Sequence, residues 1–230
     1  MIRFDNVFKS FDGMQVLAGV SFEVAAGEIL AIVGPSGTGK SVTLKHIVGL
    51  LTPDSGTVTV SDGARIGYLF QGGALLAWLT VRENVALPLK ETTKLPDDEI
   101  TRLTDEALKA VGLEDSAEKY PAEISGGMVK RAGLARAIVR HADAVLYDEP
   151  TSGLDPVTAQ TIHRLIKRLN AEQGLTSLVV THDLAGACSF ADRILMLKDG
   201  RVVLAAAPEE FLKSDIPAVR EYVIASKGEL

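Results

Sequence analysis

The chain has 230 residues, of which 47% are hydrophobic and 23% are charged, proportions that fit neither a disordered, a collagen-like nor a coiled-coil protein. Its formal net charge of -6 argues against bulk electrostatic binding to nucleic acid or anionic lipid. The single cysteine, Cys188, cannot form an internal disulfide bond, which favours a reducing compartment. We expect no signal peptide, because the first residues are charged. We also expect no membrane-spanning helix, because the longest uncharged stretch, 66–81, is too short.

The amino-terminal part alternates apolar and polar residues, a pattern typical of half-buried antiparallel strands. We expect these strands at Arg3–Val7, Val16–Val24 and Gly56–Val60. Short, continuously apolar runs are typical of strands buried on both faces of a parallel sheet. They occur at Ile29–Val33, Ala144–Tyr147 and Ser177–Val180. The sequence therefore predicts an α/β fold with a mostly parallel sheet and an antiparallel β edge subdomain.

A helical pattern dominates the middle of the chain. Apolar residues recur at helical spacing from Ile100 to Val111, and Gly112 supplies a stop signal. The tail is predicted to form two short helices, Glu209–Lys213 and Pro217–Ala225. Since there is no linker or repeat, we expect a single domain. Its expected parts are a core at 1–72 and 141–208, an inserted helical lobe at about 73–140, and a tail at 209–230.

The strongest motif is a phosphate-binding loop, called the phosphate loop below. It consists of Gly34, Pro35, Ser36, Gly37, Thr38, Gly39, Lys40 and Ser41 and matches G-x-x-x-x-G-K-[ST]. Glycine lets backbone N–H groups face phosphate oxygens, and the helix that follows directs its positive end at them. We expect Lys40 to reach the β- and γ-phosphates of a nucleotide and Ser41 to offer its hydroxyl to Mg²⁺. A glycine-rich turn without a ligand is the alternative, which the strand before and the helical run after the loop disfavour.

Two acidic residues follow the apolar run Ala144–Tyr147. Asp148 suits the carboxylate that holds Mg²⁺ through water beside a phosphate loop. Glu149 lies one residue further out, where a carboxylate can accept the proton of an attacking water. A solvated turn is the alternative for two acids after a strand. The phosphate loop earlier in the chain favours the catalytic interpretation.

The segment from Ile124 to Met128, called the signature below, reads Ile-Ser-Gly-Gly-Met. With the phosphate loop and the acidic pair, it makes nearly the whole chain resemble the nucleotide-binding subunit of an ATP-binding-cassette (ABC) transporter. The usual family sequence is Leu-Ser-Gly-Gly-Gln, so the two ends depart from it while Ser125, Gly126 and Gly127 match. The resemblance implies an ATPase that uses ATP and Mg²⁺. It also implies that two copies meet head to tail, with ATP between the phosphate loop of one and the signature of the other.

Four further positions match the family pattern one at a time. Phe11 occupies the place of the aromatic residue that stacks on adenine, with core packing as the alternative. Asp155 belongs to the loop that reaches towards the partner copy. Gln71 resembles the glutamine that senses Mg²⁺ and water, and His182 resembles the histidine that contacts the γ-phosphate, with a structural histidine as its alternative. The resemblance thus implies a catalytic set of Lys40, Gln71, Glu149 and His182 and a metal set of Ser41, Gln71 and Asp148.

The run from Leu69 to Leu89 narrows the kind of transporter. It resembles the Mla group, which energises bacterial lipid transport with substrate-binding proteins of the mammalian-cell-entry type, and Met128 also matches that group. The connection Val60–Gly67 is shorter than most members have. The resemblance implies three partners, namely a second copy, a membrane permease and a lipid-binding protein, and no nucleic acid. It also implies a peripheral location on the cytoplasmic face of the bacterial inner membrane, held there through the permease.

Trp78, the single tryptophan, lies where family members dock the permease, with packing inside the helical lobe as the alternative.

Other classes of nucleotide-binding protein fit the chain less well. A P-loop kinase has no use for the signature, and a chromosome-structure or DNA-repair ABC ATPase needs a long coiled-coil insertion. A translation-type factor carries two cassettes, and a non-hydrolysing scaffold needs neither Glu149 nor His182. The ATPase of a polar-solute importer remains the alternative within the family.

Overall fold

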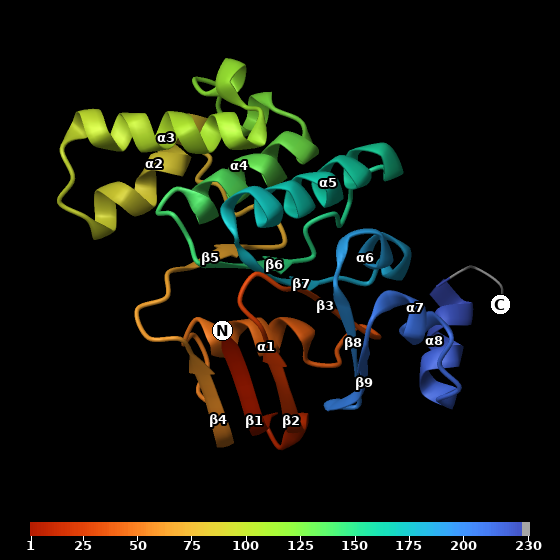
Figure 1. Ribbon diagram of the computed structural model, residues 1–230. Coiled ribbons are helices and arrows are strands. Elements are labelled where there is room, and N and C mark those ends of the chain that lie inside the picture. The colour runs from red at the N-terminus through yellow and green to blue at the C-terminus, as the bar shows by residue number, and fades with distance from the viewer. Residues whose placement is uncertain (227–230) are drawn as a thin grey trace.

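Two β-sheets organise the structure, a computed structural model in which residues 1–226 are described (Figure 1). The larger sheet has six strands in the order β5-β6-β7-β3-β8-β9, and the smaller has three in the order β2-β1-β4. The six are β3 (Ile29–Val33), β5 (Ile66–Leu69), β6 (Ala144–Asp148), β7 (Thr176–Val180), β8 (Arg193–Lys198) and β9 (Arg201–Ala206). The three are β1 (Ile2–Phe11), β2 (Met14–Val24) and β4 (Ser55–Val60).

Parallel pairing dominates the six-stranded sheet. β5, β6, β7, β3 and β8 run in one direction, and β9 is antiparallel to β8. Every residue of β3, β6 and β7 is buried, which explains why these strands are almost continuously apolar. The predicted fold class, α/β with a mostly parallel sheet and an antiparallel β part, is therefore confirmed.

The antiparallel strands form a sheet of their own rather than an edge of the larger one. Their apolar face encloses a second core between the two sheets and α1 (Lys40–Ile47). The buried members of this core include Ile2, Phe4, Val7, Leu17, Val20 and Leu44. A three-stranded sheet can bury such a face only by packing on another layer, so the two sheets stack on opposite sides of α1.

Figure 1 shows α2 to α5 over one face of the larger sheet, and α1 with the smaller sheet below the other. The remaining helices, α6 to α8, lie near β8 and β9. Across residues 1–226, no helix is long and apolar enough to cross a bilayer. The helices after α1 are α2 (Val81–Thr92), α3 (Asp97–Val111), α4 (Gly126–Ile138), α5 (Pro156–Gln173), α6 (Leu184–Phe190), α7 (Pro208–Leu212) and α8 (Pro217–Ser226). The last part of the expected tail, 227–230, lies outside the described residues.

Asn84 holds the loop that carries Trp78. Its side chain is fully buried, its Oδ1 accepts the N–H of Leu76 at 2.7 Å, and its Nδ2 donates to the carbonyl oxygen of Leu79 at 3.1 Å. A buried amide whose partners are all present fixes a loop in one conformation. The loop turns Trp78 outward, with 73% of the residue exposed, so packing of Trp78 inside the helical lobe is excluded.

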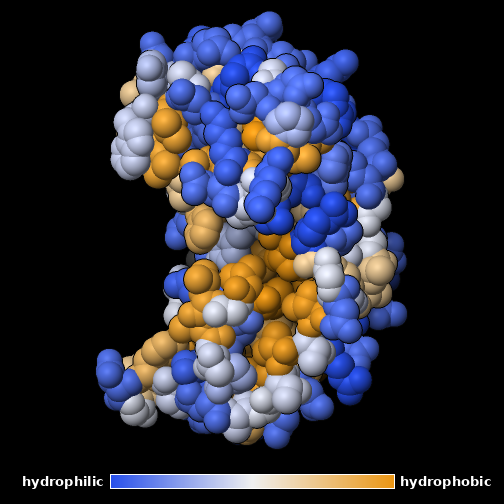
Figure 2. Space-filling model, turned by 90° about the vertical axis from the view of Figure 1, so that its left-hand side faces the viewer, coloured by the Kyte–Doolittle hydropathy of each residue, from blue (hydrophilic) through white to orange (hydrophobic). Residues whose placement is uncertain are grey.

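A hollow opens on the side of the molecule drawn in Figure 2, between the helices above and the smaller sheet below, and much of its floor is apolar. On the protein surface, β5, α2 and α4 enclose a groove of about 370 Å³, called the β5–α4 groove below. Ile66, Tyr68, Phe70, Leu87, Pro88 and Ala137 line it, together with the arginines Arg65, Arg136 and Arg140. The groove therefore combines an apolar floor with positive charge.

Helix α4 lies directly on β5, backbone against backbone. A Cβ added at Gly67 would come within 2.3 Å of the carbonyl oxygen of Ala137. A Cβ added at Gly133, on α4, would come within 2.8 Å of Leu69 Cδ1 and 3.0 Å of the carbonyl oxygen of Gly73. Both positions thus require glycine for close approach rather than for an unusual φ.

We expect Gly67→Ala to lower the free energy of unfolding by about 1–3 kcal/mol, because the new methyl group must push α4 off the strand. Equilibrium urea unfolding of the isolated chain measures this difference. Gly72→Ala is the matched control, since its Cβ would meet open space and it should leave the midpoint unchanged. Equal unfolding curves for both variants would contradict the direct contact between α4 and β5.

Candidate nucleotide-binding and catalytic site

The phosphate loop connects β3 to α1 and leaves the amino end of that helix free. Gly39 precedes the helix with φ 94° and provides no side-chain cap, and no acidic residue lies in the first turn. Gly34 has φ 144°, and a Cβ there would come within 2.1 Å of the carbonyl oxygen of Leu197. The N–H groups at such an uncapped helix end need an acceptor, and phosphate oxygens supply it. The loop therefore fits an anionic phosphate group.

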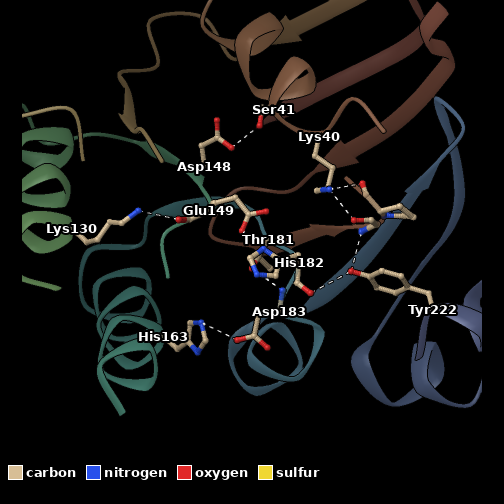
Figure 3. Close-up of polar contacts among 12 residues, drawn as sticks. Lys40, Ser41, Lys130, Asp148, Glu149, His163, Thr181, His182, Asp183 and Tyr222 are labelled. Carbon is tan, nitrogen blue, oxygen red and sulfur yellow. Dashed lines mark hydrogen bonds and ion pairs between the residues drawn. The ribbon is translucent and has the colours of Figure 1, made fainter. Parts of the chain in front are cut away.

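Lys40 curves back over the phosphate loop. Its Nζ donates to the carbonyl oxygens of Gly34 at 2.8 Å and of Pro35 at 2.7 Å (Figure 3). An ammonium group has three N–H donors, so one is left for a ligand. Burial lowers the pKa of Lys40, and the nearby carboxylates of Glu149 and Asp148 oppose that shift. The charge that would meet a phosphate is thus held in place before any ligand arrives.

Asp148, at the end of β6, lies between two hydroxyl groups. Ser41 Oγ donates to its Oδ1 at 2.7 Å, and the Tyr68 hydroxyl donates to its Oδ2 at 3.1 Å. Burial and the Asp148 charge raise the pKa of Tyr68, so its hydroxyl remains a donor. Mg²⁺ prefers oxygen ligands from carboxylates and hydroxyls, and Ser41 with Asp148 offers both at one point. These residues fit the metal, whereas Gln71 is exposed and makes no hydrogen bond to them within the described chain.

Glu149 and His182 meet beside this point, at the ends of the paired strands β6 and β7. His182 Nδ1 lies 2.8 Å from Glu149 Oε2. Figure 3 draws these two side chains next to each other. The Glu149 N–H donates to the carbonyl oxygen of Val180 at 2.9 Å, which ties the residue to β7. Its φ of 50° is left-handed, a strained conformation for a residue with a side chain. The surrounding contacts therefore hold the carboxylate in one direction.

The structure adds two residues to this cluster that the sequence did not indicate. Lys130, on α4, donates from Nζ to the carbonyl oxygen of Glu149 at 3.2 Å, and burial lowers its pKa. The Tyr222 hydroxyl, on α8, accepts the N–H of Gly34 at 3.3 Å and donates to the carbonyl oxygen of His182 at 3.5 Å (Figure 3). A lysine on an otherwise apolar helix face was a usable signal for Lys130. Nothing in the tail sequence pointed to Tyr222.

The signature lies on the far side of the cluster, at the start of α4. Ser125 caps this helix, its Oγ accepting the N–H of Met128 at 3.3 Å. Gly127 packs on α5, where a Cβ would come within 2.5 Å of Thr158 Cγ2. Among residues 1–226, no hydrogen bond joins Ser125, Gly126 or Gly127 to the phosphate loop. One copy of the chain therefore does not bring the two halves of the expected ATP site together.

Phe11 and Asp155 also lie outside the polar cluster. Phe11 ends β1, is 40% exposed, and has Lys9 Nζ 5.5 Å from its ring centroid, so it is not a core residue. Asp155 caps α5 by accepting the N–H groups of Val157 and Thr158, at 3.0 and 3.1 Å. Hydrogen bonds from Thr158 lower the pKa of Asp155. Both side chains remain accessible on the surface.

Comparison with known proteins agrees with this geometry. The ABC transporter family model matches residues 17–152, which include the phosphate loop, the signature and both carboxylates. The probable ribonucleotide transport ATP-binding protein mkl of Mycobacterium leprae is 40% identical, over 96% of this chain and 68% of that protein. The methionine import ATP-binding protein MetN of Caulobacter vibrioides is 40% identical over 100% and 74%, respectively. The chloroplastic protein TRIGALACTOSYLDIACYLGLYCEROL 3 of Arabidopsis thaliana is 38% identical over 98% and 74%.

The chain spans about two thirds to three quarters of the length of these relatives. Among solved structures, the dimeric post-hydrolysis state of the ATP-binding cassette MJ0796, bound to ADP and Pi, has a TM-score of 0.81 and 35% identity. That similarity covers 90% of this chain and 99% of the other. From the site geometry, the family match and these relatives together, the chain belongs to the ABC transporter family and is an ATPase that uses ATP with Mg²⁺.

Proposed function

We propose that two copies of this chain enclose ATP and that its hydrolysis drives a membrane permease carrying phospholipid or another hydrophobic molecule. The observation that carries the paired arrangement is the separation of the phosphate loop from the signature within one copy. The dimeric structure of the cassette MJ0796, bound to ADP and Pi, supports this arrangement. In that arrangement, Ser125, Gly126 and Gly127 of the second copy supply the missing donors, and Asp155 lies near the contact between copies.

Different residues of the same chain bind the phosphate, the metal and the adenine of ATP. Lys40 binds it through its remaining N–H, and the uncapped end of α1 adds backbone donors. Ser41 and Asp148, with Gln71 at the same sheet edge, would hold Mg²⁺, which neutralises charge on the phosphate oxygens. Phe11 offers its exposed ring to adenine.

Glu149 acts as the general base, with His182 beside it. Oε2 of Glu149 is engaged by His182 Nδ1, which leaves Oε1 free to accept a proton from water. The other ring nitrogen of His182 is then free to contact the γ-phosphate. Tyr222 and Lys130 hold the backbone on both sides of this pair, so the distance between base and phosphate loop is fixed.

Two features support docking to a permease. Trp78 exposes a large aromatic surface, and the β5–α4 groove is lined in part by Leu87 and Pro88 of α2, the helix that follows the Trp78 loop. Large exposed apolar surfaces on a soluble protein commonly mark sites where a partner or ligand binds. We propose that a cytoplasmic helix of a permease docks on both features and so holds the chain at the cytoplasmic face of the bacterial inner membrane.

A hydrophobic cargo, together with a lipid-binding partner protein, is supported by the Mla-like run Leu69–Leu89. The relative from Arabidopsis thaliana, whose name contains that of a galactolipid, also supports a lipid cargo. The 40% identity to a methionine import protein favours the second candidate, the ATPase of a polar-solute importer. The two candidates share the same ATPase site and differ in the permease and its cargo.

Replacing Glu149 by Gln tests the general base. We expect Glu149→Gln to lower ATP turnover by roughly 10²–10⁴-fold, because the amide cannot accept the proton of water. ATP binding should persist and the ATP-bound dimer should accumulate, as size-exclusion chromatography with ATP can measure. If the variant turns over ATP at the normal rate, Glu149 is not the base.

Mixing two inactive variants tests the paired arrangement. Lys40→Ala removes the phosphate-loop cation, and Ser125→Arg blocks the signature, so neither homodimer has an intact site. A heterodimer of the two keeps one intact site, and we expect partial recovery of ATP hydrolysis. The readout is turnover of a tandem-purified heterodimer, with each parent as the reference. A verified heterodimer that stays inactive argues against a site shared between copies.

Truncating Trp78 tests the docking surface. We expect Trp78→Ala to weaken permease association by roughly thirtyfold, since truncating an aromatic anchor costs about 2 kcal/mol or more. Basal ATP hydrolysis by the isolated chain should stay the same, because Trp78 is exposed and lies outside the site. Leu50→Ala, at an apolar residue that is 62% exposed elsewhere, is the matched control and should bind normally.

Reconstituted vesicles then separate the two cargo candidates. Phospholipid transfer that falls in step with the lost association supports the lipid proposal. Transport of amino acids with no lipid transfer, by a complex that still forms, selects the polar-solute importer instead.

A further inference from the structure

Tyr68 lies where the β5–α4 groove meets the carboxylate of the metal set. Tyr68 lines the groove, and its ring packs against that of Phe70 at an interplanar angle of 30°, with centroids 4.3 Å apart. Its hydroxyl, at the other end of the same side chain, donates to Asp148 Oδ2 at 3.1 Å. One side chain thus touches a surface groove and a buried carboxylate that comes 80 positions later in the chain.

The two hydroxyl groups on Asp148 determine how its carboxylate is turned. With Ser41 on Oδ1 alone, the carboxylate could still rotate about its Cβ–Cγ bond. The Tyr68 hydroxyl occupies Oδ2 and removes that freedom. Groups that orient a metal-holding carboxylate in this way commonly change metal affinity by 10–100-fold when they are lost.

The ring end of Tyr68 is less constrained. Tyr68 and Phe70 are both partly open to solvent, and Phe70 is 40% exposed. A group that fills the groove contacts this aromatic pair, because both residues line it. A shift of the ring there moves the hydroxyl by a similar amount at Asp148, because the phenol is rigid.

We propose that Tyr68 is a positioning residue that orients Asp148 towards Ser41 for Mg²⁺ and makes this orientation depend on what occupies the β5–α4 groove. The second half rests on the proposed function in one respect, namely that a partner fills the groove. The tests below need neither the permease nor its cargo, so they can fail independently of the lipid proposal.

The first test titrates Mg²⁺ against binding of a fluorescent ATP analogue to the isolated chain. Tyr68→Phe keeps the ring and removes the hydroxyl. We expect the Mg²⁺ concentration for half-maximal tightening of binding to rise roughly tenfold or more, while affinity in EDTA stays the same. Tyr120→Phe, at an exposed tyrosine elsewhere, is the matched control and should titrate like the unmodified chain. An unchanged Mg²⁺ midpoint overturns the proposal, and so does an equal loss of binding in EDTA.

The second test fills the groove artificially. Leu87→Cys, in a chain whose own cysteine is replaced by Cys188→Ser, can be labelled with a bulky maleimide. We expect the label to shift the Mg²⁺ midpoint at least threefold when Tyr68 is present and to have no effect when Tyr68→Phe is added. A shift of equal size in both chains, or none in either, overturns the link between groove and carboxylate. Thermal unfolding of each variant verifies that the fold is intact.

Discussion

Parallel pairing of β3 with β7, and of β7 with β6, is the constraint on which the site depends. Parallel strands present their carboxyl ends at one edge of a sheet, so whatever follows each strand is brought to the same place. The phosphate loop follows β3, Asp148 and Glu149 end β6, and His182 follows β7. The first of these segments lies 107 positions from the second in the chain, and the second lies 33 positions from the third, yet all three meet in one polar cluster.

Concentrating charge at this edge has a cost that the neighbouring residues offset. Burial lowers the pKa of Lys40 and of Lys130, which means that solvent is missing around both ammonium groups. Backbone carbonyl oxygens and the two carboxylates replace that solvent. Buried charges without such partners would destabilise the fold by several kcal/mol. The left-handed φ of Glu149 also costs free energy. Hydrogen bonds to its N–H and to its carbonyl oxygen hold the residue in that conformation.

The sequence predicted the strands that precede the site, because continuous apolar runs bounded by glycine or acidic residues leave few alternatives. It did not predict β8 and β9 or the separation of the smaller sheet, since one apolar run resembles another until its neighbours are known. The contacts of Tyr68 and Tyr222 with the site were not predicted for a different reason. Their hydrogen bonds join residues 80 and 188 positions apart, and no local periodicity encodes such pairs. The roles of Asp155 and the signature depend on a second copy, the role of Phe11 depends on a bound nucleotide, and all three stay predictions.

The contact between α4 and β5 has a mechanical consequence. Side chains between packed secondary-structure elements can change rotamer when one element moves, whereas Gly67 places the β5 backbone directly against the α4 backbone at Ala137. A displacement of the amino end of α4, where the signature lies, is therefore transmitted along the helix to β5. That strand ends two residues before Gln71. Gly67, which lies outside both the phosphate loop and the signature, thus couples movement of α4 to movement of β5.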